Sequence, residues 1–299
     1  MSTLVNWLVS ACGVLLVCLG IRDIYTTLWH PKGLGTLCRG LFVLLWRAAG
    51  KVGGNGRALA AVGPLGLAAT MIMWTVTLVL GCALVYLPHM PGGFAFSSSL
   101  QPASSSDPVA ALYLSLVTVT TLGFGDITPT LPALRLLVPL QALVGFWLFT
   151  AAVTWVLQVY PALGRRRAVA RQLALMATTG AEDVVATGRS SIAAQWLVSV
   201  TEALASVEMD LGQYGEIYFF REEEPDESLA ATLSFVPRLV DAGRSSAAPE
   251  VRCAARMLDE QMERLARRLA SNYLHDVGSV HDVCQSLAAE HGHSPITNR

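Results

Sequence analysis

The residues with the clearest chemical potential lie together at Thr118–Asp126, in the order Thr-Val-Thr-Thr-Leu-Gly-Phe-Gly-Asp. A cation that leaves water needs replacement oxygens, and consecutive backbone carbonyls can supply them if they point the same way. Such a backbone alternates between conformations that L-residues favour and ones that they disfavour, and glycine adopts the latter at little steric cost. Gly123 and Gly125 stand at alternate positions, and Thr121 adds a hydroxyl at one end. The segment could therefore coordinate a dehydrated cation.

A short apolar run, Ala110–Val119, leads into these residues. It is too short to cross a bilayer, which takes about 20 residues. At membrane depth such a run must be re-entrant or buried in protein, because lipid does not satisfy exposed backbone groups. Leu112–Val119 predicts a half-helix whose carboxy-terminal end points toward the membrane centre. The partial negative charge at that end of a helix favours a cation.

Three longer apolar stretches predict membrane spans, at about Leu4–Leu28, Pro64–Leu87 and Leu131–Tyr160. The first could also be a cleavable signal peptide, but its basic residue, Arg22, follows the apolar core, which favours a retained helix. No span carries basic residues at every third position, so a voltage sensor of the usual kind is not expected.

Basic residues predict the orientation, since they mark the cytoplasmic side of short loops. Arg165, Arg166 and Arg167 follow the third span, whereas Pro88–Pro108 has no Lys or Arg. Five more lie between the first two spans: Lys32, Arg39, Arg47, Lys51 and Arg57. We expect an amino terminus outside the cell, a cytoplasmic carboxy-terminal half and a location in the plasma membrane. The stretch Leu37–Ala49 is either an interfacial helix on the inner leaflet or a short buried helix.

The two halves of the chain differ in composition. Overall, 53% of the residues are hydrophobic and 14% are charged, against about 25% charged in soluble domains. Residues 1–164 hold seven basic and three acidic residues, and residues 165–299 hold fourteen and nineteen. The acidic second half has no basic stripe, so a nucleic acid partner is not expected. The six cysteines form no CxxC pair and are interpreted as small hydrophobic residues or reduced thiols.

The Thr118–Asp126 segment resembles the signature of the tetrameric potassium channel family, TxTTxGYGD or TxTTxGFGD, and meets every fixed position. The similarity covers about residues 64–160, like the two-transmembrane pore module of bacterial ion channels. It implies a homotetramer in membrane lipid, with K⁺ as the transported ion and no cofactor. The implied selectivity filter comprises Thr121, Leu122, Gly123, Phe124 and Gly125, with K⁺ at the first four and support from Thr120 and Asp126. Val117 stands where some members carry an acidic partner for Asp126, so another group must hold that carboxylate.

Three residues of the third span are candidates for gating. Gly145 lies 22 residues after Gly123, which resembles the hinge glycine of the family, although close helix packing would also require a small residue. Phe149 and Val153 follow on the same face. They are candidates for lining a cavity or forming an apolar gate, with contact to lipid or a neighbouring helix as the alternative for Phe149.

The fold expected is an all-α membrane protein: outer helix, re-entrant pore helix with filter, and inner helix, with an extra amino-terminal transmembrane helix and a cytoplasmic helical domain. The expected segments are 1–62 (amino-terminal helix and interfacial stretch), 63–162 (pore domain) and 163–299 (cytoplasmic domain). Residues 165–299 have no GxGxxG after a strand, so a Rossmann module is not expected.

Apolar residues of the cytoplasmic half recur with helical spacing. The first stripe is Ile192, Trp196, Val200, Leu204 and Val207. The second is Leu229, Leu233, Val236 and Val240, with Pro237 inside it. The third is Val251, Leu258, Met262, Leu265, Leu269 and Tyr273. They predict a helical bundle, with a tetramerising coil as the alternative for the third.

Two polar clusters are weak candidates for divalent metal sites. Glu222–Glu227 is an acidic run, which is more often a solvated loop. His275, Asp276, His281 and Asp282 repeat at a spacing of six, which suits one helical face poorly. The cytoplasmic ligand, if any, is not identified.

The predicted function is passive conduction of K⁺ by a channel subunit. The alternatives are a non-selective cation channel and a membrane-anchored signalling or scaffold protein with a degenerate pore. An enzyme is not expected, because the sequence offers no nucleophile–base set, metal cluster or phosphate loop. Substitution of Gly123 is expected to be harmful, and substitution of Gly92 or Gly93 in the outer segment to do little.

Overall fold

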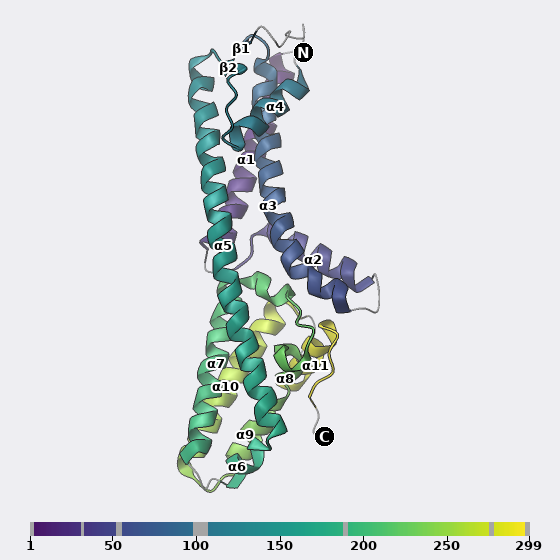
Figure 1. The fold of residues 1–299 in the computed structure, drawn as a ribbon, viewed down its shortest axis with the longest axis vertical. Helices are drawn as coiled ribbons and strands as arrows, with labels where there is room; N and C mark the ends of the chain where they lie inside the picture. Colours follow the sequence, from purple (N-terminus) through teal and green to yellow (C-terminus); the bar gives the residue numbers. More distant parts are fainter. Residues whose placement is uncertain are drawn as a thin grey trace. The chain divides into compact units, whose positions relative to one another are not determined.

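A computed structural model describes residues 3–30, 33–51, 56–97, 107–187, 191–274 and 278–296 of the chain (Figure 1). Three of its helices, α1, α3 and α5, are long and apolar enough to cross a membrane, and the shorter apolar helix α4 lies between the second and third. The only strands in the described ranges are β1 and β2, which pair antiparallel. The expected all-α membrane fold is confirmed.

The first part of the chain contains α1 (Thr3–Leu28), α2 (Thr36–Lys51), α3 (Gly56–Tyr86), η1 (Leu87–His89), β1 (Phe94–Phe96), α4 (Pro108–Val119), β2 (Ile127–Pro129) and α5 (Pro132–Thr178). The later elements are α6 (Ala181–Thr187), α7 (Ser191–Gln213), η2 (Gly215–Phe219), η3 (Pro225–Glu227), α8 (Leu229–Thr232), α9 (Phe235–Ser245), α10 (Pro249–Asn272) and α11 (Val280–Glu290).

The chain divides into two compact units that differ from the three expected segments. The first unit comprises Met1–His30, Leu34–Leu41 and Gly66–Leu157, and the second comprises Pro31–Gly33, Phe42–Leu65 and Gln158–Arg299. The expected boundaries at 62/63 and 162/163 fall inside α3 and α5, because both helices run on without a break. The expected segment 1–62 is shared between the units, since α1 packs against α3 whereas most of α2 packs against residues of the carboxy-terminal half.

Small residues let α1 and α3 approach closely in the first unit. A β-carbon on Gly13 would lie 2.5 Å from the carbonyl oxygen of Gly81, and one on Gly81 would lie 2.7 Å from the side chain of Val17. Glycine at such a crossing is the usual device for close packing of membrane helices. This packing supports the interpretation of α1 as a retained helix.

Asp23, near the end of α1, is buried and caps α2. Its carboxylate accepts hydrogen bonds from the backbone N–H of Leu37 at 2.8 Å and of Cys38 at 3.3 Å. It also accepts one from the indole N–H of Trp74 on α3, at 2.9 Å. A carboxylate at a helix amino terminus satisfies free N–H groups and complements the helix dipole. Asp23 thereby joins α1, the start of α2 and α3.

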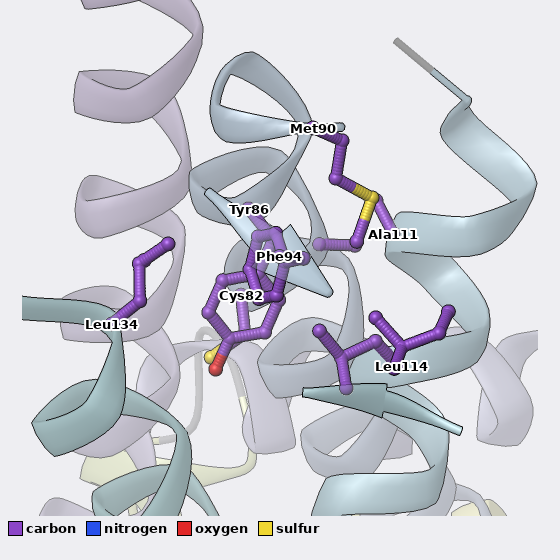
Figure 2. Close-up of a cluster of buried hydrophobic side chains, with 9 residues drawn as sticks. Cys82, Tyr86, Met90, Phe94, Ala111, Leu114 and Leu134 are labelled. Atoms are coloured by element: carbon purple, nitrogen blue, oxygen red, sulfur yellow. The ribbon is translucent and has the colours of Figure 1, made fainter. Parts of the chain in front are cut away.

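A cluster of buried apolar side chains holds α4 in place (Figure 2). It gathers residues from α3, the turn and strand that follow, α4, β2 and the start of α5: Cys82, Tyr86, Met90, Phe94, Ala111, Leu114, Ile127 and Leu134. Gly93 packs nearby, and a β-carbon there would lie 2.9 Å from the carbonyl oxygen of His89. The expectation that Gly93 tolerates substitution is therefore wrong, whereas Gly92 has open space around it.

The second unit is a helical bundle in which α10 packs against α7, α9 and α11. The third apolar stripe lies on α10 and is buried from Val251 to Leu269. Because these side chains are covered by the same chain, the structure favours the bundle over a tetramerising coil. On α7 the residues of the predicted stripe are buried from Val200 onward, but Ile192 is exposed and Trp196 is half-buried. Ala193 and Leu197 take the inner positions instead.

The second stripe is divided between two short helices. Leu229 lies on α8 and Val236 and Val240 on α9, with Leu233 between them, and all four are buried. Pro237 lies in the first turn of α9, where a missing N–H costs no helical hydrogen bond. The break between α8 and α9 thus accommodates the proline.

The helix α2 buries one side in protein. Phe42 is fully buried and stacks on Phe219 at 5.3 Å between ring centroids, and Trp46 lies edge-on to the same ring at 5.8 Å. Leu44, on another side, is exposed. The sequence left an interfacial and a buried helix as alternatives, and the structure combines a buried stripe with an exposed apolar face.

Candidate functional site

The helix α4 positions the Thr120–Asp126 segment. Asp107 begins it as an N-cap, accepting a hydrogen bond from Val109 N at 2.9 Å, and Pro108 occupies the first turn. Both residues are typical of helix starts. The helix ends at Val119, as expected, and begins two residues before the predicted Ala110. Its carboxy-terminal end leads directly into the segment.

The backbone of the segment has positive φ at every second residue: 59° at Thr121, 53° at Gly123 and 76° at Gly125. This is the left-handed region, which costs an L-residue about 1–2 kcal/mol and glycine almost nothing. Two of the three positions are glycines, as the sequence predicts. Thr121 has a side chain and therefore carries the conformational cost of a positive φ. Its N–H donates to the carbonyl of Thr118 at 3.0 Å.

Bonds to α4 hold the beginning of the segment. The Thr120 hydroxyl donates to the Leu116 carbonyl at 2.8 Å, and Leu122 N donates to the Val117 carbonyl at 3.1 Å. Beyond them the side chains of Leu122 and Phe124 are 60% and 66% exposed in a single chain. The proposed coordinating residues therefore form one exposed strip of chain.

Tyr113 holds the Asp126 carboxylate, for which the sequence identified no partner. Its hydroxyl donates to Asp126 Oδ2 at 2.6 Å, and Ile127 N donates to Oδ1 at 3.0 Å. The carbonyl of Asp126 also accepts from Ser97 N at 2.8 Å, which ties the segment to the chain after β1. Tyr113 lies one helical turn before Val117 on α4. A phenol from the preceding turn therefore holds Asp126 here, in place of the acidic residue that is absent at position 117.

A buried polar network that was not predicted from the sequence joins α4 to both neighbouring helices. The amide of Gln141 on α5 donates to the hydroxyl and carbonyl of Ser115, at 2.8 and 3.0 Å. Its oxygen accepts from the hydroxyl of Tyr86 on α3 at 2.7 Å, and Ser115 Oγ donates to the Val79 carbonyl at 2.8 Å. A lone amide inside an apolar span was the signal, because such groups need buried partners.

Gly145 makes a close approach between α5 and the end of α4. A β-carbon there would lie 2.2 Å from the carbonyl oxygen of Val119. Gly145 and Phe149 line one groove with Thr120 and Thr121. Val153 is 47% exposed and does not line this groove. The contact accounts for glycine at 145 by packing, and a hinge role stays a prediction.

The polar clusters of the carboxy-terminal half have structural partners. In the described parts of the chain, no three His, Cys, Asp or Glu side chains converge to hold a metal ion. Glu222 is buried against Arg166, at 2.6 Å, and Glu227 pairs with Arg171. Asp282 completes the capping box of α11, and its bonds from Ser279 lower the pKa of its carboxyl. His275 and Asp276 lie outside the described residues.

The three arginines after the third span have a second use. Arg165 pairs with Asp210 of α7 at 2.7 Å, and Arg167 lies 3.5 Å from the carboxylate of Glu222 that Arg166 contacts. The sequence marked these residues only as indicators of the cytoplasmic side. The structure shows that they also anchor the last part of α5 within the second unit.

This chain is similar to a known protein family and to two bacterial proteins. A family model described as "Ion channel" matches residues 72–160. The chain is 31% identical over 174 residues to the uncharacterized membrane protein YdjJ of Bacillus subtilis (strain 168), covering 58% of this chain and 50% of that one. It is 31% identical over 88 residues to protein LctB of Bacillus caldotenax, covering 28% and 65%. The chain thus spans about half to two thirds of these relatives.

No solved structure matches this chain. The family match runs from α3 through α4 and the Thr120–Asp126 segment into α5, which are the elements that build the site. Residues 72–160 are therefore similar to an ion channel domain, and they lie in a chain whose α1, α3 and α5 are long and apolar enough to cross a membrane.

Proposed function

We propose that this chain is one subunit of a homotetrameric, potassium-selective channel, with residues 121–125 as the selectivity filter. The observation that carries the proposal is the Thr118–Asp126 signature together with its backbone, in which φ is positive at residues 121, 123 and 125. Thr121, Leu122, Gly123 and Phe124 would present oxygens to K⁺ in place of its water shell. Thr120, Asp126 and Tyr113 would keep this backbone in position.

Four copies follow from the filter itself. One chain supplies one filter strip and cannot surround an ion, and the apolar side chains of Leu122 and Phe124 need cover that one chain does not give them. Four strips around an axis would supply a ring of carbonyls at each level. Gly145, Phe149 and the threonines at the inner end of the strip would then border the cavity below the filter.

The orientation proposed is an outer amino terminus and a cytoplasmic second unit in the plasma membrane, and cysteine labelling tests it. A labelled position must be accessible to the reagent, which rules out Ser246, because it is only 3% exposed. Ala95 and Ser245 are exposed instead. An impermeant maleimide applied to whole cells should modify Ala95→Cys and spare Ser245→Cys until the cells are opened. The opposite pattern would overturn the orientation.

This labelling needs a background without reactive native thiols. Cys12, Cys18 and Cys253 are exposed and would be replaced by alanine, while the other three cysteines are buried. The background protein should show no labelling from either side.

Selectivity is tested with purified protein in liposomes that hold a potassium gradient. K⁺ flux is expected to exceed Na⁺ flux at least about tenfold, equivalent to about 1.4 kcal/mol of discrimination. Protein-free liposomes and a variant with an altered filter, Gly123→Ala, serve as controls. Equal fluxes of the two ions would indicate a non-selective cation channel. No flux from folded tetramers would indicate a scaffold with a degenerate pore.

A further inference from the structure

A fully enclosed histidine lies at the end of α11, in the second unit. His291 is 4% exposed, and its ring contacts those of Trp46 on α2 and Tyr218 in η2, with centroids 5.0 and 5.1 Å apart. Tyr218 stacks in turn on Tyr273, the residue after α10, with ring centroids 4.0 Å apart. One imidazole thus joins the amino-terminal helix α2 to the carboxy-terminal segment of the chain.

The charged neighbours of His291 are mostly cations. Arg221 donates through Nε to the His291 carbonyl at 2.6 Å, and His293 contacts the Glu222 carbonyl at 2.9 Å. Arg166, on α5, is 5% exposed and pairs with Glu222. Arg167 also lies within 3.5 Å of the Glu222 carboxylate.

The tyrosines around the ring stay neutral, and their hydroxyls are hydrogen-bonded to other groups of the protein. The Tyr218 hydroxyl donates to the carboxylate of Glu290 on α11, and burial raises the pKa of Tyr218. The Tyr273 hydroxyl donates to the Gly215 carbonyl. From α2, the ring meets only the uncharged Trp46 among the described contacts. The histidines are therefore the groups here that change charge between pH 5 and 8.

A small cavity at this point leaves one nitrogen of the imidazole without a protein partner. The cavity is lined by Arg166, Tyr218, Glu222 and His291, with apolar residues of α7, α8, α10 and α11 around them. Among the described residues, neither Nε2 of His291 nor Nε of Arg166 has a hydrogen-bond partner. A proton added at Nε2 would thus place a second cation beside the Arg166 guanidinium, out of water.

We propose that His291 is a proton sensor: neutral, it locks the carboxy-terminal segment and α2 together, and in acid its protonation releases this contact. A buried charge without a partner is expensive, so the protonated form favours an arrangement in which the ring reaches water. The contact that opens is the one between Trp46, Tyr218 and His291.

The sign of the pH dependence follows from linkage. Burial first, and then the nearby Arg166, lower the pKa of His291 well below its usual value. The released form has the ordinary histidine pKa of about 6.5. The packed arrangement therefore keeps its full stability above about pH 6.5 and loses it progressively as the pH falls below that value. Burial also lowers the pKa of His293, which adds to the effect in the same direction.

Release would reach the helices of the ion channel domain. Arg221, which holds the His291 carbonyl, also reaches the carbonyl of Gly56 at the start of α3, at 3.4 Å. Arg166 belongs to α5, the helix that also carries Gly145. Cytoplasmic acid is thus expected to change ion flux, and this second consequence rests on the proposed function.

The sensor is tested first without any ion flux, on the purified full-length protein. Tryptophan fluorescence followed from pH 8 to pH 5 should show a sigmoidal change with a midpoint between about 5 and 6.5. The change should disappear in His291→Phe, which keeps an aromatic ring but does not titrate. It should also disappear in Trp46→Phe, because Trp46 is the reporter. His281→Gln is the matched control, since His281 is exposed on α11, and should behave as wild type. His293→Gln should keep a transition.

The outcomes separate the sensor from the channel. No transition in wild type, or a wild-type transition in folded His291→Phe, overturns the sensor. A transition that depends on His291 in a protein without flux supports the sensor and removes the proposed function. In liposomes, flux with a His291-dependent midpoint supports both.

Folding of the variant is checked by thermal unfolding at pH 8, and His291→Gln is the second choice. If neither folds, histidine NMR on wild-type protein decides. An imidazole at 291 that titrates together with loss of the packed state supports the sensor, and one that titrates as an ordinary histidine overturns it.

Discussion

Replacing Gly123 by alanine is expected to abolish selective K⁺ flux while leaving expression and assembly intact. Gly123 has φ of 53°, and a β-carbon there would meet no atom of its own chain within 4 Å. The penalty is thus conformational rather than a clash within the subunit, at about 1–2 kcal/mol per residue. In a tetramer it acts four times on one ion path, for about 4–8 kcal/mol. About 5.5 kcal/mol already moves a two-state equilibrium from 99:1 to 1:99.

The control for this experiment is Gly92→Ala, because Gly92 also has open space and does not have a positive φ. Liposome flux and the size of the detergent-solubilised assembly are measured for both variants. Gly93 is unsuitable as a control, since its β-carbon would press on His89 and Leu134. Normal potassium flux and selectivity in Gly123→Ala would remove residues 121–125 as the filter.

Replacing Gln141 by leucine is expected to destabilise the first unit by about 2–4 kcal/mol per subunit. The change removes two bonds to Ser115 and leaves the hydroxyl of Tyr86, which is fully buried, without its acceptor. An unsatisfied buried group costs about 1–3 kcal/mol. Single hydrogen bonds between membrane helices are worth about 0.6 kcal/mol on average, so the two lost bonds to Ser115 account for about 1.2 kcal/mol. The excess above this value reports the orphaned hydroxyl. Unfolding in SDS, followed by circular dichroism, measures the change.

Two variants make this test specific. Gln158→Leu is the same substitution on the same helix, at an exposed residue whose amide oxygen accepts a single 3.3 Å bond, and should cost under about 0.5 kcal/mol. The double variant Tyr86→Phe, Gln141→Leu should cost less than the sum of its parts, because the orphaned hydroxyl is gone. If Gln141→Leu unfolds like Gln158→Leu, the network does not hold α4 in place.

The sequence by itself determined the features that depend on neighbours along the chain. The three spans, the short helix α4 and the stripes on α7 and α10 follow from apolar content and periodicity, which are local. The positive φ at Gly123 and Gly125 was also predictable, because the backbone requirement selects the residue type at that position. The incorrect predictions were local as well. Ile192 and Trp196 were predicted on the buried face of α7 but do not lie there, because several faces of that helix carry apolar residues.

Only the tertiary structure decided which distant groups meet. Tyr86 and Gln141 lie 55 residues apart and Asp23 and Trp74 lie 51 apart, and neither pair has a local pattern that names the partner. The same is true of Trp46 and His291, which come from opposite ends of the chain. The sequence showed that Asp126 needed a partner and that Gln141 was an amide in an apolar span. Which group satisfies each depends on how helices pack, because hydrogen bonds and buried charges are set by distance in space rather than along the chain.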